Sequence, residues 1–185
     1  MLENHHQILS SVADGDAKAF RSLYDLYNGK VFNTAISYLQ SEQDAEEVTQ
    51  DVFTSIYRNA GKFKGQASVS TWIYRITVNA SLNAIKKKKR NTFLSLSSFE
   101  YDAPDFDHPG IVLENKENAR ALFKAINALP GNQKTAFILS FIEDLQRQQV
   151  ADIMETSLKA VESLLQRGKK NLRNILEKTY DDRRI

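Results

Sequence analysis

The stretch QRQQVADIMETSLKAVESLLQRGKKNLRNIL, residues 146–176, decides the fold of this chain. Its apolar residues recur at helical spacing on both sides of a short polar interruption. This pattern predicts a helix over 146–154, a three-residue turn from Glu155 to Ser157 and a longer helix from Leu158. Small Ala151 allows the two helices to approach closely, as in a helix-turn-helix. The predicted buried seam consists of Val150, Ile153, Leu158, Val161, Leu165 and Leu172.

The turn itself carries an unusual residue. Many helix-turn-helix turns use glycine to enter the left-handed backbone region, whereas this chain has Glu155 or its neighbour there. We therefore expect a turn that is slightly strained or differently shaped.

The face opposite the seam is polar and mostly basic. In a DNA major groove, the early positions of such a helix reach base edges, while later lysines and arginines neutralise phosphates. The alternative is an ordinary helical hairpin with a solvated basic face. The residues on this face are Lys159, Glu162, Ser163, Gln166, Arg167, Lys169, Lys170 and Arg173.

Composition supports a globular protein. The 185 residues are 42% hydrophobic and 26% charged, which argues against a largely disordered chain. There is no cysteine, so disulfides and thiolate metal sites are excluded. No apolar run approaches the about 18 to 20 residues that span a bilayer, and MLENHHQILSS does not read as a secretory leader. We expect a cytoplasmic protein.

Helical periodicity dominates and no alternating strand pattern of useful length occurs, so the predicted fold is all-α. Turn or capping residues predict breaks at 14–16, at Asn28 and Gly29, at Ser41 and at 64–66, giving four to five N-terminal helices. Residues 93–113 lose helical period and gather acids and two of the three prolines. We therefore predict a domain over 1–92, a flexible acidic linker over 93–113 and a second domain over 114–185.

A net charge of +2 is too small to identify a partner, but the charge is unevenly distributed. Asp44, Glu47 and Asp51 form one face of a predicted helix. Such a stripe is commonly a solvated face, and a metal site there would need further ligands. The three histidines that could act as further ligands, His5, His6 and His108, lie in other parts of the sequence. The opposite face of the same helix is apolar and consists of Val48, Val52 and Ile56.

A second stripe follows a polar loop in FKGQASVSTWIYRITVNASLNAIKKKKR, residues 63–90. Cationic side chains to hold a backbone, an amide to read a base edge and an aromatic ring to stack on a displaced base suit single-stranded DNA. The alternative places Trp72 in the core and leaves the lysines merely solvated. The stripe comprises Trp72, Arg75, Asn79, Asn83, Lys86 and Arg90.

The order of these features resembles the extracytoplasmic-function (ECF) group of bacterial sigma factors. DAEEVTQDVF (44–53) is similar to their core-polymerase-binding helix and TWIYRITVN (71–79) to their promoter-melting helix. LPGNQKTAFILSFIEDLQRQQVADI (129–153) and AVESLLQRGKKNLR (160–173) are similar to their C-terminal domain. The resemblance covers nearly the whole chain.

The resemblance implies roles for particular residues. One set of residues would bind core polymerase by docking on the clamp coiled coil of its largest subunit. Residues 64–70 would form the minus-ten specificity loop, and Asn79 would belong to the pocket that reads a minus-ten base. Glu162, Ser163, Gln166 and Arg167 match minus-thirty-five-reading positions. The implied core-binding set is Asp44, Glu47, Gln50 and Asp51; the minus-ten and melting set is Lys64, Gln66, Ser68, Trp72, Arg75, Asn79, Asn83 and Lys86.

Some residues depart from the family pattern, so promoter preference is not carried over. Asn83 replaces a common aspartate, and Glu162 and Leu164 stand where basic residues are frequent. A glutamate repels phosphate but accepts a hydrogen bond from a cytosine amino group. The acidic linker resembles the interdomain connector of the family, which threads a basic channel of the polymerase. The alternative is that the linker is only a flexible spacer kept soluble by its charge.

The sequence therefore predicts a sigma factor that is not an enzyme and needs no cofactor or metal. Its expected partners are bacterial core RNA polymerase and promoter DNA, both duplex and non-template strand, with an anti-sigma factor as a further family partner and no membrane insertion. One alternative is a stand-alone helix-turn-helix regulator. Another, a hydrolase built on Asp44, Glu47 and Asp51, is disfavoured because no histidine or nucleophile is close in sequence.

Overall fold

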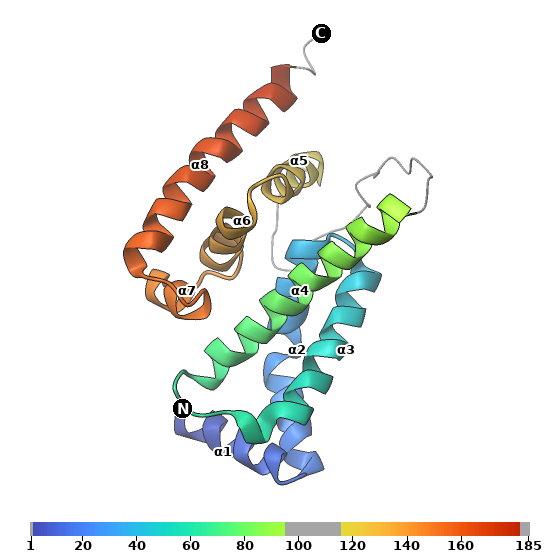
Figure 1. Ribbon diagram of the computed structural model, residues 1–185, viewed down its shortest axis with the longest axis vertical. Helices are drawn as coiled ribbons and strands as arrows, with labels where there is room; N and C mark the ends of the chain where they lie inside the picture. The colour runs from blue at the N-terminus through green and yellow to red at the C-terminus, as the bar shows by residue number, and fades with distance from the viewer. Residues whose placement is uncertain (1, 95–115, 182–185) are drawn as a thin grey trace. The chain divides into compact units, whose positions relative to one another are not determined.

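The computed structural model describes residues 2–94 and 116–181, and all regular structure within those two ranges is helical (Figure 1). The chain forms two compact units, Met1–Ser98 and Phe99–Ile185. The prediction of an all-α protein with two helical domains is confirmed. Most of the predicted acidic linker, from residue 95 onward, lies outside the described residues.

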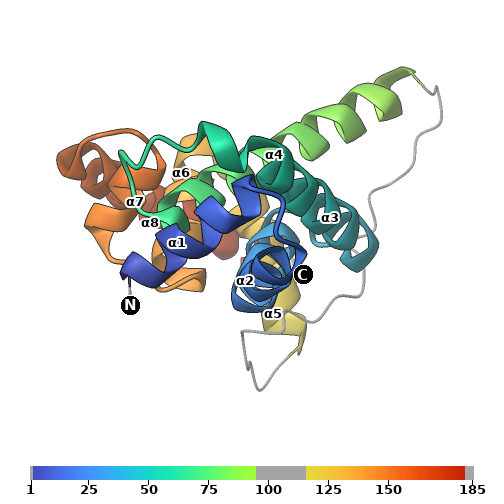
Figure 2. The same ribbon diagram turned by 90° about the horizontal axis from the view of Figure 1, so that it is seen from below.

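The N-terminal unit contains α1 (Leu2–Ala13), α2 (Ala17–Leu39), α3 (Glu42–Asn59), the short 3-10 turn η1 (Ala60–Lys62) and α4 (Val69–Leu94). Helices α2, α3 and α4 pack against one another, and α1 packs against α2. Helix α1 also contacts η1 and α4, so the connection from α3 to α4 passes beside α1 (Figure 2).

Most of the predicted breaks in this unit have a visible backbone cause. Gly15 has a φ of +87° and separates α1 from α2, whose first turn is capped by the Asp16 carboxylate. The Ser41 hydroxyl accepts a hydrogen bond from the Asp44 backbone N–H and so caps α3. Gly65, at a φ of +69°, lies in the connection to α4.

The predicted break at Asn28 and Gly29 is wrong, because α2 continues through both residues. Tyr27 and Val31, one turn apart, are both buried, and this packing holds the helix together across Gly29, where an added Cβ would meet no atom within 4 Å. The core contacts of α2 therefore outweigh the local preference for a turn.

The inner faces of α3 and α4 form the core of the unit. Val48, Val52 and Ile56 are buried, as the helical spacing predicts. Thr77 and Ser81 are buried among the apolar residues of α4, and each donates to the backbone carbonyl four residues earlier: Thr77 to Ile73 at 2.9 Å and Ser81 to Thr77 at 2.8 Å. These polar groups are thus satisfied within their own helix.

The C-terminal unit contains α5 (Lys116–Asn127), α6 (Gly131–Phe137), the π-helical turn η2 (Ile138–Ile142), α7 (Arg147–Ile153) and α8 (Leu158–Asp181). Helix α8 packs against α5, α6 and α7. The predicted pause at Leu129 and Pro130 is present, whereas η2 and the left-handed residue Asp144 that follows it were not predicted.

Helices α7 and α8 form the predicted helix-turn-helix. Glu155 has a φ of +52°, so a non-glycine residue does occupy the left-handed position of the turn. The prediction that Leu158 belongs to the buried seam is wrong, because this residue is 41% exposed. A helical side chain tilts toward the N-terminus, so that of the first residue points over the connecting turn and not onto a partner helix. The other predicted seam residues are buried: Val150, Ile153, Val161, Leu165 and Leu172.

In the part of the chain that the structure describes, no helix combines the length and apolar character that crossing a membrane requires.

Candidate functional site

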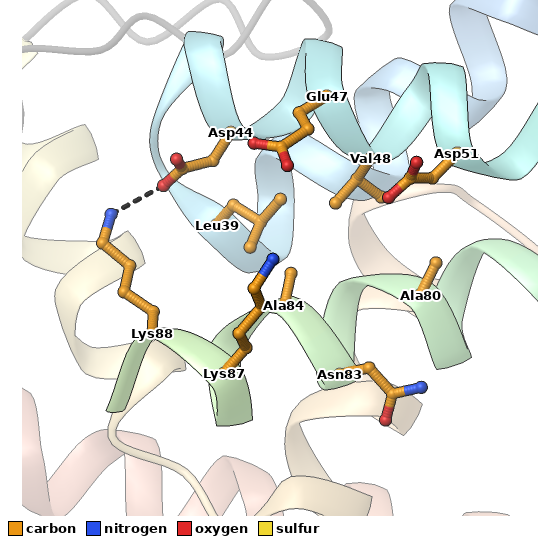
Figure 3. Close-up of a pocket in the computed structure, with 10 residues that line it drawn as sticks. All are labelled: Leu39, Asp44, Glu47, Val48, Asp51, Ala80, Asn83, Ala84, Lys87 and Lys88. Atoms are coloured by element: carbon orange, nitrogen blue, oxygen red, sulfur yellow. Dashed lines mark hydrogen bonds and ion pairs between the residues drawn. The ribbon is translucent and has the colours of Figure 1, made fainter. Parts of the chain in front are cut away.

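The acidic stripe of α3 is one wall of a groove, and α4 is the other (Figure 3). The groove encloses about 470 Å³ and has small or apolar residues between two charged rims. Glu47 and Asp51 are exposed on the α3 rim, whereas Asp44 is half-buried. The lining residues are Leu39, Asp44, Glu47, Val48, Asp51, Ala80, Asn83, Ala84, Lys87 and Lys88.

One ion pair closes the end of this groove. The Lys88 ammonium donates to the Asp44 carboxylate at 2.6 Å, and the two side chains are 47% and 30% exposed. At this exposure, water and salt screen the pair, and its contribution to stability is at most about 1 kcal/mol. The pair therefore matters more for the charge that α3 presents than for holding the unit together.

The groove brings together two sets of residues that the sequence analysis treated separately. Asn83, assigned to promoter melting, lies on the wall that faces the predicted docking residues Asp44, Glu47 and Asp51. Lys88 belongs to the run of lysines, residues 86–89, near the end of the stretch 63–90. Its partner lies 44 residues earlier in sequence, a pairing that no local pattern can signal. Gln50, also in the predicted docking set, is exposed but does not line this groove.

The loop before α4 has an exposed tip and a fixed end. Lys64 and Gln66 are exposed on either side of Gly65. Ser68 is engaged differently: its hydroxyl accepts from the Thr71 backbone N–H at 3.0 Å and lies 2.9 Å from the Thr71 hydroxyl. It thus caps α4, which gives this predicted DNA-contacting residue a structural task.

Helix α4 presents the second predicted stripe. Asn79, Asn83 and Lys86 are exposed, and Arg75 is half-buried. Trp72, for which core packing and base stacking were the two alternatives, is half-buried. Its ring packs against Phe63 at a centroid distance of 5.4 Å. This contact leaves part of the indole open to solvent at the start of the helix.

The outer face of α8 is exposed over the whole predicted set, from Lys159 to Arg173. Arg167 donates from Nε to the Ser163 carbonyl at 3.2 Å, and Lys169 lies 4.7 Å above the Phe141 ring. Arg147 of α7 lies 3.9 Å from Glu162, an exposed pair that sequence reasoning missed. This arginine offsets the charge of the one acidic residue on the predicted DNA-facing surface.

The described side chains include no cluster of three or more histidine, cysteine or acidic residues that could hold a metal ion. The groove carboxylates face lysine side chains instead.

Two family models match the chain, one in each compact unit. Sigma-70 region 2 matches residues 23–91, which hold most of α2, all of α3 and most of α4. Sigma-70, region 4, matches residues 119–172, which include the helix-turn-helix. The groove and the α4 stripe thus lie within the first match, and most of the exposed α8 face lies within the second.

Relatives extend the match to nearly full length. The ECF RNA polymerase sigma-E factor of Haemophilus influenzae is 30% identical over 178 residues, covering 92% of this chain and 94% of the relative. The ECF RNA polymerase sigma factor SigW of Bacillus subtilis is 26% identical, with 91% and 94% covered.

Among solved structures, the sigma factor RpoE of Bartonella quintana, crystallised with the anti-sigma factor NepR, has the same fold. The TM-score is 0.69 at 21% identity, and the match covers 87% of this chain and 98% of that one. Two sigma-70 regions in the expected order, with full-length ECF relatives, make this chain a member of the ECF sigma factors, which bind core RNA polymerase and promoter DNA and direct transcription initiation.

Proposed function

We propose that this sigma factor divides promoter recognition between two exposed helical faces and docks on core polymerase through a third. The observation that carries the proposal is the character of α4. Its inner face is buried in the core from Val69 to Ser81, while its outer face presents exposed amides and cations. A helix fixed in this way is a rigid platform on which an unpaired base can be held without reorganising the protein.

The minus-ten contact is assigned to the loop tip and to this outer face. Lys64 and Gln66 approach the strand from the loop, Trp72 offers a partly open ring for stacking, and Asn79 offers donor and acceptor groups to a base edge. Arg75, Asn83 and Lys86 extend the surface along the helix. Binding a displaced base here offsets the unstacking cost of a few kcal/mol that opening the duplex requires.

The minus-thirty-five contact is assigned to α8. Residues near its start, Glu162, Ser163 and Gln166 with Arg167, face base edges, and the later cations face phosphates. Lys159 flanks the reading positions at the first turn. Lys169, Lys170 and Arg173 follow them along the helix.

The polymerase contact is assigned to the exposed carboxylates of α3, Asp44, Glu47 and Asp51, together with Gln50. Acidic side chains along one helix face complement a basic partner surface and speed its association. The groove gives these carboxylates a shaped floor, formed in part by Ala80 and Ala84.

Further parts of the proposal concern the protein as a whole. We assign residues 1–92 and 114–185 to the two functional domains and 93–113 to the linker, and we infer a cytoplasmic protein that catalyses no covalent step itself. The resemblance to a sigma factor solved with an anti-sigma factor supports regulation by a partner of that class.

Run-off transcription with purified core polymerase on a genomic promoter library tests these assignments. We expect the chain to direct initiation at a subset of promoters and Asn79→Ala to change the preference at one minus-ten base. A stand-alone regulator would leave the core enzyme inactive unless another sigma factor were added. If neither Lys64→Ala nor Asn79→Ala changed the base preference at any minus-ten position, the assignment of the minus-ten contact to the loop and the α4 face would be refuted.

A further inference from the structure

Two adjacent histidines of helix α1 face different neighbours. His6 contacts the connection between η1 and α4, and His5 contacts Tyr27 of α2. We propose that His5 and His6 are positioning residues that clasp this connection at both ends and thereby set the base preference of the minus-ten contact. The proposal rests on the proposed function of the loop and of α4. It assigns a role to two residues that the sequence analysis left unused.

His6 holds the beginning of the connection. Its ring lies 5.5 Å from that of Phe63, which in turn packs 5.4 Å from Trp72, so three rings form a continuous series from α1 to the start of α4. The His6 ring also closes over the backbone of Gly65. A Cβ atom at position 65 would lie 3.5 Å from Nε2, and the φ of +69° disfavours any side chain there.

His5 holds the far end through a buried intermediary. The Tyr27 hydroxyl of α2 lies 2.9 Å from His5 Nδ1, and the same hydroxyl is hydrogen-bonded to the Ser70 side chain in the first turn of α4. Burial raises the pKa of the Tyr27 phenol, and the Ser70 hydrogen bond partly offsets this shift. The neutral phenol can therefore accept from Ser70 and donate to His5 at the same time.

The two loop residues proposed to touch DNA lie between these two anchors. Lys64 and Gln66 are exposed, and their backbone has no regular helical or sheet hydrogen bonding of its own. A short irregular segment loses conformational freedom when it binds, and that cost falls when its ends are already fixed. Anchoring at Phe63, Gly65 and Ser70 thus defines where the loop tip lies relative to Asn79.

The test uses holoenzyme reconstituted from core polymerase and the full chain, on promoters that differ at one minus-ten base or one minus-thirty-five base. The measured quantity is the ratio of open-complex formation rates between the preferred and the altered base. We expect His6→Ala and Tyr27→Phe each to reduce the minus-ten ratio by roughly tenfold, because displacement of a positioning group weakens discrimination more than overall binding. The minus-thirty-five ratio should not change.

Three controls separate positioning from simple destabilisation. His6→Phe retains a ring against Phe63 and should restore the ratio, and Gln7→Ala, an exposed change on the same helix, should leave it unaltered. Thermal unfolding of each variant reports the integrity of the unit. If His6→Ala does not fold, the comparison of Tyr27→Phe and His6→Phe with the parent protein carries the test.

Each outcome is informative about one proposal or the other. An unchanged minus-ten ratio in His6→Ala and Tyr27→Phe, with Asn79→Ala and Lys64→Ala still altering it, would overturn the clasp alone. Equal loss of both ratios would also overturn it, because a general structural defect would then explain the data. If Asn79→Ala and Lys64→Ala were silent as well, the proposed minus-ten role would itself have failed and the clasp with it.

Discussion

Asp51 is an exposed carboxylate on the rim of the α3 groove, two turns beyond the Asp44–Lys88 pair. Because a charge reversal there places a cation on the surface proposed to meet a basic partner, we expect Asp51→Lys to weaken core binding by roughly tenfold at low salt. Glu42→Lys is the matched control, since Glu42 is exposed on the same helix but does not line the groove. Fluorescence titration with core polymerase measures both. Normal binding by Asp51→Lys would show that the docking face is misassigned.

The cations of α8 should separate into two classes. Lys170 is exposed beyond the reading positions, so Lys170→Ala should weaken duplex binding on every sequence and lower the salt-dependence slope by about one. Arg167→Ala should instead change preference at particular base pairs. Binding isotherms on a panel of single-base variants, at several salt concentrations, distinguish them. The same uniform loss for both variants would contradict this division between base reading and phosphate contact.

At the level of secondary structure, two glycines with equal space around them should respond oppositely to the same substitution. Gly29 lies inside α2 and Gly15 lies between α1 and α2 at a φ of +87°, and a Cβ at either would meet nothing within 4 Å. We expect Gly29→Ala to stabilise the protein by about 0.5 to 1 kcal/mol, because alanine is the better helix former. Gly15→Ala should destabilise it, because the left-handed region costs an L-residue roughly 1 to 2 kcal/mol. Chemical denaturation provides both values, and shifts of the same sign would contradict the argument.

The helices that sequence reasoning predicted well are those whose signals agree. In α3, the Ser41 cap, the acidic first turn and the apolar spacing of Val48, Val52 and Ile56 all indicate one amphipathic helix. At Gly29 the local turn signal competed with burial of the neighbouring Tyr27, and burial decided the outcome. Local patterns predict elements reliably only where tertiary packing does not oppose them.

The candidate site was predictable in its residues but not in its geometry. Helical periodicity identified the exposed faces of α3, α4 and α8, since exposure follows from a buried opposite face. The groove, the Asp44–Lys88 pair and the contacts of His5 and His6 depend on how distant helices are placed, and residues far apart in sequence carry no mark of that proximity. The predicted burial of Leu158 was wrong for a related reason. Its position at the end of a helix, and not its spacing in the apolar pattern, determines whether other residues cover it.

At the scale of the whole molecule, the chain forms two compact units, to which we assign duplex recognition and single-strand recognition separately. On the proposed assignment, each unit contributes a modest affinity, and their connection within one chain raises the effective concentration of the second contact once the first has formed. This arrangement favours promoters in which both elements are present at a spacing that the pair can reach. Specificity then depends on distance along the DNA as well as on base identity.

In the free protein, the Lys88 ammonium serves as the counter-ion of the Asp44 carboxylate. A basic polymerase surface that takes over Asp44 would release Lys88 from this carboxylate, at the end of the same helix that carries the proposed single-strand contacts. Core binding and DNA binding would then be thermodynamically linked, and each would strengthen the other by the same factor. Lys88→Gln would abolish that reciprocity while leaving both surfaces in place. A single surface ion pair, worth little to stability, would thus delay tight DNA binding until the polymerase has been engaged.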